Sequence, residues 1–177
     1  MNSRWQDLAR RIGRLALREA PRFVRDVART RGTTPSREPV RREQRVPVSS
    51  APSGSVARTI SYAPQPDGQA DPGEIVWAWV AYEDDPSQGK DRPVLVVGRD
   101  GGTVLGLMLS SQSEREGQRN WLALGPGPWD REARPSWIRL DRVLRMSETG
   151  IRREGAVLDP ARFDSVARRL RASYGWR

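Results

Sequence analysis

The chain has 177 residues and contains neither His nor Cys, and its 31 Lys and Arg outnumber its 22 Asp and Glu. Without Cys there are no disulfides, thiol nucleophiles or thiolate metal sites, and without His there is no Ser-His triad and no His ligand for zinc. Any catalysis therefore depends on Arg, Lys, carboxylates, hydroxyls and the backbone. The length allows one ordinary domain, or a smaller domain with a tail.

The excess positive charge is concentrated in the N-terminal part. Residues 1–70 carry 14 Arg and 6 acidic side chains, whereas residues 71–177 carry 17 basic and 16 acidic side chains. A polycation attracts nucleic acid or another anionic surface without reading a sequence. We therefore expect residues 1–45 to contact such a surface, and a basic tail that only improves solubility is the alternative.

Residues 1–30 are predicted to form one amphipathic helix, weakened at Pro21. Its apolar positions at helical spacings are Trp5, Leu8, Ile12, Leu15, Phe23 and Val27, with Arg residues on the other faces. A basic helix of this kind suits a membrane surface or a partner protein, and packing on its own domain is the alternative. The sequence has no apolar run of about 18 residues and no apolar signal segment, so we expect a cytoplasmic protein.

Residues 31–71 consist of Pro, Ser, Gly, Arg and Gln with isolated apolar residues. Such a composition buries too little apolar surface to offset the entropy of ordering, which predicts a disordered linker. Clustered apolar runs separated by Gly, Pro and Asp follow the linker. This pattern is typical of an antiparallel β domain, here over residues 72–177.

The β domain is predicted to contain five strands, a short extended piece and a final helix. The strands are expected at 74–82, 93–98, 103–110, 120–124 and 136–146, and the extended piece at 155–159. The run 93–98 is almost entirely apolar, so both of its faces are expected to be covered. Asp159 and Pro160 are favoured helix-start residues, and the helix is expected to reach about Ser173.

Five segments of this domain together resemble the PemK/MazF family of toxin-antitoxin endoribonucleases. In order they read PGEIVWAWV, GKDRPVLVVGRD, LMLSSQ, IRLDRVLRM and EGAVLDPARFDSVARRL. The resemblance covers about residues 73–171. It implies a mainly β fold, a small SH3-like antiparallel barrel with a C-terminal helix. It also implies a homodimer that cuts single-stranded RNA without metal or cofactor and is restrained by a cognate antitoxin.

The chemistry implied by the resemblance needs a group that takes the ribose 2′-OH proton, a cation for the phosphate and a donor to the leaving oxygen. Arg92 matches the family's catalytic arginine, and Pro93 restricts it to extended geometry. A guanidinium grips phosphate through two parallel N–H bonds. Ser110 matches a hydroxyl position that binds the scissile phosphate. For Arg92 alone, a solvated arginine at a strand edge is the alternative, and for Ser110 alone, a serine that caps the turn after a strand.

Arg139 and Asp141 match an Arg-x-Asp that some family members use as an acid-base pair. Because they lie two residues apart on a predicted strand, they share one face. Asp141 is then the candidate proton acceptor and Arg139 stabilises charge, although an exposed ion pair is an equal explanation. Candidate substrate-binding residues are Lys90, Ser111 and Gln112.

Two features favour other functions. The loop before Arg92 carries the acidic residues Glu83, Asp84, Asp85 and Asp91, which repel phosphate. The β domain also has little net charge and so little general attraction for RNA, which leaves two alternatives: the basic tail supplies that attraction, or the true ligand is another protein. One alternative is a non-catalytic binding module of the same fold whose tail contacts nucleic acid or a membrane, and a DNA-gyrase inhibitor is another. Tryptophans can stack bases, but burial in the sheet explains most of them better; these are Trp77, Trp79, Trp121, Trp129 and Trp137.

Overall fold

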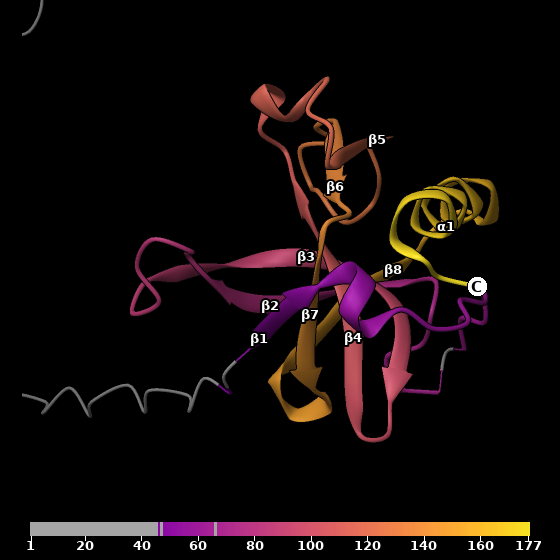
Figure 1. Ribbon diagram of the computed structural model, residues 1–177. Coiled ribbons are helices and arrows are strands. Elements are labelled where there is room, and N and C mark those ends of the chain that lie inside the picture. The colour runs from indigo at the N-terminus through magenta and orange to yellow at the C-terminus, as the bar shows by residue number, and fades with distance from the viewer. Residues whose placement is uncertain (1–45, 47, 66) are drawn as a thin grey trace, which may run out of the picture. The chain divides into compact units, whose positions relative to one another are not determined.

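The computed structural model describes residues 46, 48–65 and 67–177 (Figure 1). The chain divides into two units, residues 1–41 and 42–177. The helix predicted over residues 1–30, the contact predicted for residues 1–45 and the first part of the predicted linker lie outside the described residues.

The second unit is built from antiparallel strands and one α-helix, which confirms the predicted mainly β fold class. The elements are β1 (Ser49–Pro52), β2 (Glu74–Ala81), β3 (Gly89–Asp100), β4 (Thr103–Ser110), β5 (Trp121–Gly125), β6 (Ser136–Arg139), β7 (Arg142–Ser147), β8 (Ile151–Val157) and α1 (Pro160–Tyr174). The strand order of the main sheet is β1-β7-β4-β3-β2-β8. Strands β5 and β6 lie off this path. The arrangement is consistent with the expected barrel-like fold.

Strand β4 belongs to both sheets. Its residues 103–108 pair with β3 and residues 103–106 with β7 in the main sheet. Its last two residues pair with β6, Leu109 with Ile138 and Ser110 with Trp137. Strand β6 in turn pairs with β5. The small β5–β6 sheet is therefore attached at the end of β4 (Figure 1). Beyond this end, the first residues of β3 pair with β2 alone.

The main sheet has a hydrophobic cluster on each face. Along β3, Leu95 and Val97 belong to the cluster that includes α1, whereas Val94 and Val96 belong to the opposite cluster. All four side chains are fully buried. Strict alternation of side chains along a strand explains this division. The prediction that both faces of 93–98 are covered is confirmed.

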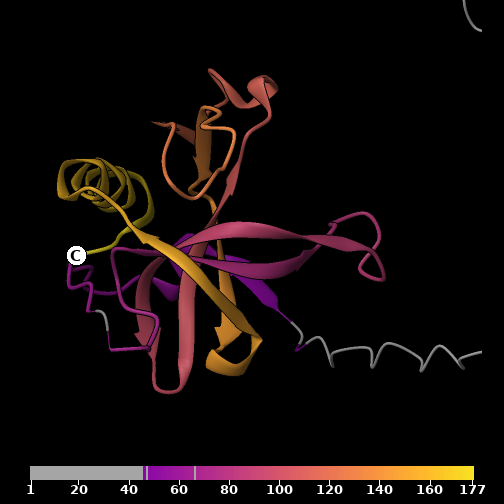
Figure 2. The same ribbon diagram turned by 180° about the vertical axis from the view of Figure 1, so that it is seen from behind.

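Helix α1 begins as the sequence predicts. The carboxylate of Asp159 accepts hydrogen bonds from the N–H groups of Ala161 and Arg162, at 3.0 and 3.2 Å, and Pro160 occupies the first turn. The buried face of the helix carries Phe163, Val166, Ala167 and Leu170. In Figures 1 and 2 the helix lies on the opposite side of the sheet from the projecting β2–β3 hairpin. Within the described residues, no helix is long and apolar enough to cross a membrane.

The prediction of a disordered linker is wrong for its last part. Residues Ser49–Pro52 form β1, which pairs with β7, and Ser53 is buried with its N–H bonded to the carbonyl of Asp141 at 2.9 Å. Val56 and Ile60 enter the main cluster. The isolated apolar residues were too few to signal a strand locally, but long-range pairing supplies the ordering free energy that the composition lacks.

Three predicted segments differ from the structure by more than one residue in their bounds. The short extended piece predicted at 155–159 is the end of a longer strand, β8, which starts at Ile151 and ends at Val157. Strand β3 starts at Gly89, four residues earlier than expected, because Gly89 to Pro93 pair with β2 beyond the edge of β4. The predicted strand 136–146 is two strands, β6 and β7, with a break at Leu140 and Asp141. The first residues of β3 include the exposed polar side chains of Lys90 and Asp91. Because polar runs are also typical of loops, the sequence predicts a loop there.

Candidate active site

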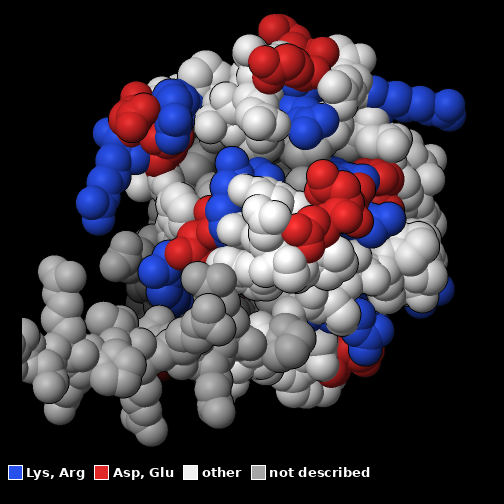
Figure 3. Space-filling view, turned by 90° about the vertical axis from the view of Figure 1, so that its left-hand side faces the viewer, with Lys and Arg blue, Asp and Glu red and all other residues white. Residues whose placement is uncertain are grey.

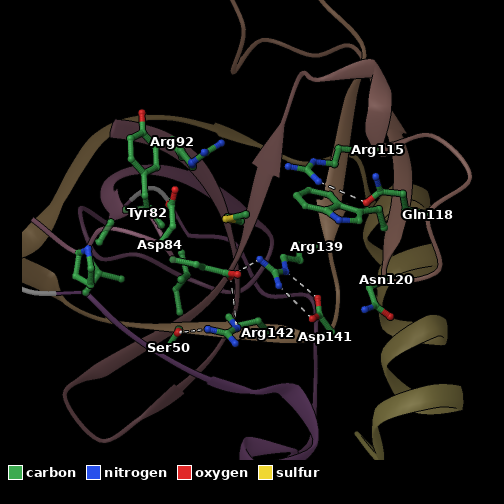
Figure 4. A pocket seen from close by; sticks show the side chains of 18 of the residues that line it. Ser50, Tyr82, Asp84, Arg92, Arg115, Gln118, Asn120, Arg139, Asp141 and Arg142 are labelled. Atoms are coloured by element: carbon green, nitrogen blue, oxygen red, sulfur yellow. Dashed lines mark hydrogen bonds and ion pairs between the residues drawn. The ribbon is translucent and has the colours of Figure 1, made fainter. Parts of the chain in front are cut away.

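A pocket of about 720 Å³ opens between the outer part of the β2–β3 hairpin with its connecting loop and the segment that joins β4 to β5. Its apolar floor consists of Val48, Val80, Met108 and Leu144. These residues belong to the hydrophobic cluster on the face of the main sheet opposite α1. Charged side chains form the walls (Figure 4). On the side of the molecule in Figure 3, basic and acidic side chains are intermixed rather than separated into a patch of one sign. The pocket therefore combines an apolar base with charges of both signs.

Arg92 enters the pocket from β3. Its backbone pairs with Ala78 of β2, and Pro93 follows where β4 has left the ladder, so the missing proline N–H is tolerated. In Figure 4 the guanidinium points into the space between Tyr82 and Arg115. Burial is the main cause that lowers the pKa of Arg92; Tyr82 raises it and Arg115 lowers it.

The Arg92 guanidinium has no carboxylate or hydrogen-bond partner among the residues that the structure describes. Its half-buried position in the pocket nevertheless removes part of its hydration. A desolvated cation without a protein partner favours an anionic ligand. Arg92 is thus the group of the pocket best placed to receive a phosphate.

Arg139 and Asp141 form a bidentate ion pair in the same pocket. Arg139 Nε donates to Asp141 Oδ1 at 2.8 Å and Arg139 Nη2 donates to Asp141 Oδ2 at 3.3 Å. Both side chains are largely buried, with exposed fractions of 18% and 26%. The predicted shared face is present although Asp141 lies in the bend after β6 rather than in a strand.

A second carboxylate, Glu83, completes this charge network. Arg139 Nη1 donates to Glu83 Oε1 at 2.5 Å, and Glu83 Oε1 lies 3.7 Å from Arg142 Nε. Arg142 Nη1 donates to Ser50 Oγ of β1 at 3.2 Å. Burial by itself lowers the pKa of Arg139, but the hydrogen bonds and charges of Asp141 and Glu83 outweigh it and raise that pKa. Arg139 is therefore fixed in place by two acidic partners.

The opposite wall comes from the segment between β4 and β5. The Arg115 guanidinium lies over the ring of Trp121, 4.8 Å from its centroid, and donates to Gln112 Oε1 at 3.2 Å and Gln118 Oε1 at 3.5 Å. Trp121 is half-buried and lines the pocket. A cation stacked on an exposed part of an indole is a surface on which nucleic-acid bases can stack.

The structure does not bring every predicted site residue into the pocket. Ser110 is 5% exposed, accepts a hydrogen bond from the N–H of Gln112 at 3.3 Å and does not line the pocket. Ser111 and Gln112 are exposed beyond the end of β4 and do not line it either. Lys90 does not line the pocket either, although its side chain lies on the same face of β3 as that of Arg92. The charge of Arg92, then burial and Arg134, lower the pKa of Lys90.

A scan against protein-family models matches residues 71–174 to the PemK-like, MazF-like toxin of type II toxin-antitoxin systems. This span is more than half of the chain. The protein belongs to the PemK/MazF family. A search of the curated proteins found no match. The family match supports a toxin of a toxin-antitoxin system, and it extends across β2 to α1, the region that carries most of the pocket.

Within this PemK/MazF domain, sequence reasoning missed several pocket residues. The sequence indicates Glu83 only as a charge that repels phosphate, although it binds Arg139. Arg115 and Arg119 have no sequence signal, because the polar run between β4 and β5 has no pattern that distinguishes a pocket wall from a solvated loop. Trp121 next to Asn120 offered the one usable signal, an aromatic residue at the start of a strand beside polar side chains.

The described part of the chain contains no cluster of three or more acidic side chains arranged to hold a metal ion. The polar groups that line the pocket are guanidinium groups, the three carboxylates of Glu83, Asp84 and Asp141, amides and a phenol. These groups can bind an anion and can accept or donate protons. They match acid-base chemistry on a phosphate ester.

Proposed function

We propose that this protein is an endoribonuclease toxin that cuts single-stranded RNA without a metal, through attack of the ribose 2′-OH on the adjacent phosphate. Family membership supports the toxin class, and the pocket supports the chemistry. The observation that carries the proposal is the Arg92 guanidinium, half-buried in the pocket and without a partner among the described residues. A guanidinium of this kind can bind two phosphate oxygens and stabilise the charge that grows on them.

In the proposed reaction, Asp141 accepts the 2′-OH proton while the 2′ oxygen forms a bond to phosphorus. The bond from phosphorus to the 5′ oxygen breaks, and that oxygen leaves as a 5′-hydroxyl with a proton taken from solvent water. The products are a 2′,3′-cyclic phosphate and a 5′-hydroxyl. Arg139 holds both oxygens of Asp141 and is proposed as a positioning residue, because its N–H groups are occupied by Asp141 and Glu83.

The remaining predicted residues keep secondary roles. Ser110 would have to turn toward the phosphate or act through the backbone of Gln112, to which it is bonded. Lys90, Ser111 and Gln112 would contact the RNA strand outside the pocket. We also propose a homodimer restrained by a cognate antitoxin and acting in the cytoplasm, where its RNA substrate is found.

Cleavage of a long unstructured RNA in the presence of a chelator tests this function. Wild-type protein should cut the RNA and leave a cyclic phosphate, whereas DNA of the same sequence should stay intact because it lacks the 2′-OH. Arg92→Ala should lower the rate about 100- to 1,000-fold. Arg152→Ala is the matched control, because Arg152 binds Asp91 on β3 outside the pocket. Intact RNA, or equal cleavage by Arg92→Ala and Arg152→Ala, would refute the proposal.

Two of the three pocket carboxylates, Glu83 and Asp141, are paired with arginine, which favours a second function, a binding module that does not cut. In that function the pocket holds an anionic partner and Asp141 only fixes Arg139. The same assay separates the two functions. Binding of RNA that remains at full length, weakened by Arg92→Ala, identifies the module.

A further inference from the structure

A second, smaller cavity of about 330 Å³ lies beside the pocket, at the C-terminal end of α1. It is lined by Arg119, Asn120, Arg169, Ser173 and Tyr174. Arg119 and Asn120 also line the main pocket, so the two cavities share a wall. Figure 4 shows Asn120 between the pocket and the helix. A single extended ligand can therefore pass from one cavity into the other.

The positive charges of the smaller cavity have no partner among the residues that the structure describes. Neither Arg119 nor Arg169 has a hydrogen bond or ion pair with any residue of the described part of the chain. The other arginines of α1 differ. Arg162 donates to the carbonyl of Pro126, Arg168 to Ser165 Oγ, and Arg171 to the carbonyl of Ile60. Arg169 is thus the helix arginine left available for a ligand.

Neutral donors complete the cavity. The Tyr174 hydroxyl donates to Asn120 Oδ1 at 3.5 Å, at the long limit of a hydrogen bond, so both groups can exchange this contact for a ligand. Burial and the charge of Asp141 raise the pKa of Tyr174, while Arg169 and Arg119 lower it. The phenol therefore keeps its proton near neutral pH. Two guanidinium groups with hydroxyl and amide donors form a set that suits a phosphodiester.

We propose that the smaller cavity binds a second phosphodiester of the same RNA strand whose scissile phosphate lies at Arg92. This inference rests on the proposed function and adds a subsite to it. Between the two phosphates, the strand passes Trp121 and Arg115, a stacking surface for a base. Alternation of guanidinium groups with an aromatic ring is how proteins hold single strands, and an acidic peptide would not use the ring.

A purely structural role for Arg169 gives a different expectation. Arg169 lies near the end of α1, where a cation stabilises the negative end of the helix dipole. In that case Arg169→Ala lowers the melting temperature and leaves RNA binding unchanged. Arg168→Ala is the matched control, because it removes the same charge from the adjacent position of the same helix, outside the cavity.

Fluorescence anisotropy with 2′-O-methyl RNA of random sequence, about 12 nucleotides long, tests the subsite without cleavage. The 2′-O-methyl group removes the nucleophile. Full-length wild type, Arg169→Ala, Arg119→Ala and Arg168→Ala are compared over a salt series. Removal of one phosphate contact lowers the slope of log K against log salt by about 0.7 for a single strand. We expect this loss for Arg169→Ala and Arg119→Ala but not for Arg168→Ala.

A dinucleotide probe of the same chemistry supplies the second readout. It is too short to fill both cavities, so Arg169→Ala should leave its affinity unchanged while weakening the longer probe. Equal affinity and slope for Arg169→Ala and Arg168→Ala would overturn the subsite, as would a loss confined to binding of an oligoglutamate peptide. Neither result depends on cleavage, so failure of the nuclease proposal and failure of the subsite remain distinguishable.

Discussion

Arg139 holds both carboxylate oxygens of Asp141 and uses its remaining terminal nitrogen to bind Glu83. This arrangement gives the two acidic residues different roles. Asp141 is held in one orientation by a bidentate contact, whereas Glu83 is more exposed and shared with Arg142. The carboxylate with the more defined position is the better candidate for directed proton transfer.

Asp141→Asn should therefore abolish most of the proposed activity. The amide keeps the shape of the side chain but cannot take the 2′-OH proton, and a general base contributes about 100- to 10,000-fold in rate. The rate of RNA cleavage is the measurement. Glu83→Gln is the control, since it removes the other carboxylate bound to Arg139 and should retain most of the rate. Equal losses in the two variants would contradict the assignment of the base.

Lys90 gives a direct measure of the electrostatic field around Arg92. It is the only lysine of the chain, so its side-chain resonance is unambiguous in an NMR titration. The pKa of Lys90 lies below the ordinary lysine value of 10.5, with the charge of Arg92 as the largest cause. Arg92→Ala should raise this pKa, and Arg152→Ala should not. An unchanged pKa in Arg92→Ala would show that the two cations do not interact.

The same shift predicts a small pH dependence of stability. Folded Lys90 loses its proton at a lower pH than unfolded Lys90, so the unfolded chain binds more protons between the two pKa values. The free energy of unfolding should then rise with pH in the window that ends near 10.5. Denaturant titrations of wild type and Arg92→Ala at several alkaline pH values measure this, and the rise should be smaller in the variant.

Trp121 should contribute to RNA affinity through stacking. Loss of a stacked base typically costs about 1–3 kcal/mol, so Trp121→Ala should weaken binding of a single-stranded RNA roughly 5- to 150-fold, and Trp121→Phe should lose less. Trp77→Ala is the control, because Trp77 is also half-buried but pairs within the sheet outside the pocket. The same anisotropy assay applies. Similar losses for Trp77→Ala and Trp121→Ala would indicate a general effect on folding.

Three glycines predict a graded series of stabilities. Gly73 has φ +107°, and an added Cβ would lie 2.7 Å from the Tyr62 ring. Gly101 has φ +59° and open space, and Gly102 has open space without a positive φ. Thermal unfolding should show the largest loss for Gly73→Ala, more than about 1 kcal/mol, a smaller one for Gly101→Ala and almost none for Gly102→Ala. Equal losses at Gly73 and Gly101 would exclude a contribution from the Tyr62 contact.

Much of the fold could be predicted because local patterns agreed with long-range packing. The apolar run after Pro93 indicated a strand buried on both faces, and Asp159 with Pro160 marked the start of α1. Strand β1 could not be predicted, because Ser49–Pro52 has no apolar alternation and is ordered by pairing with β7. The strand is stabilised by its pairing with β7, a contact that a local sequence pattern cannot indicate.

The candidate site was predictable only where residues lie close together in the sequence. Arg139 and Asp141 are two positions apart, so their contact follows from local geometry. Glu83 reaches the same pair across 56 positions of sequence, and Arg115 joins the pocket from a polar loop. Ser110 shows the opposite error. Its sequence position matched a motif, but the turn of β4 toward β6 buries its side chain.

The small β5–β6 sheet pairs with β4 through two residue pairs, and Leu124 and Ile138 also pack it into the main hydrophobic cluster. The pocket has one wall on the β2–β3 hairpin and the other on the segment that leads into β5, so a bound strand would connect these two walls. Occupancy should slow amide hydrogen exchange in β5 and β6 more than in β7, a signature of ligand that is visible even in variants with no turnover.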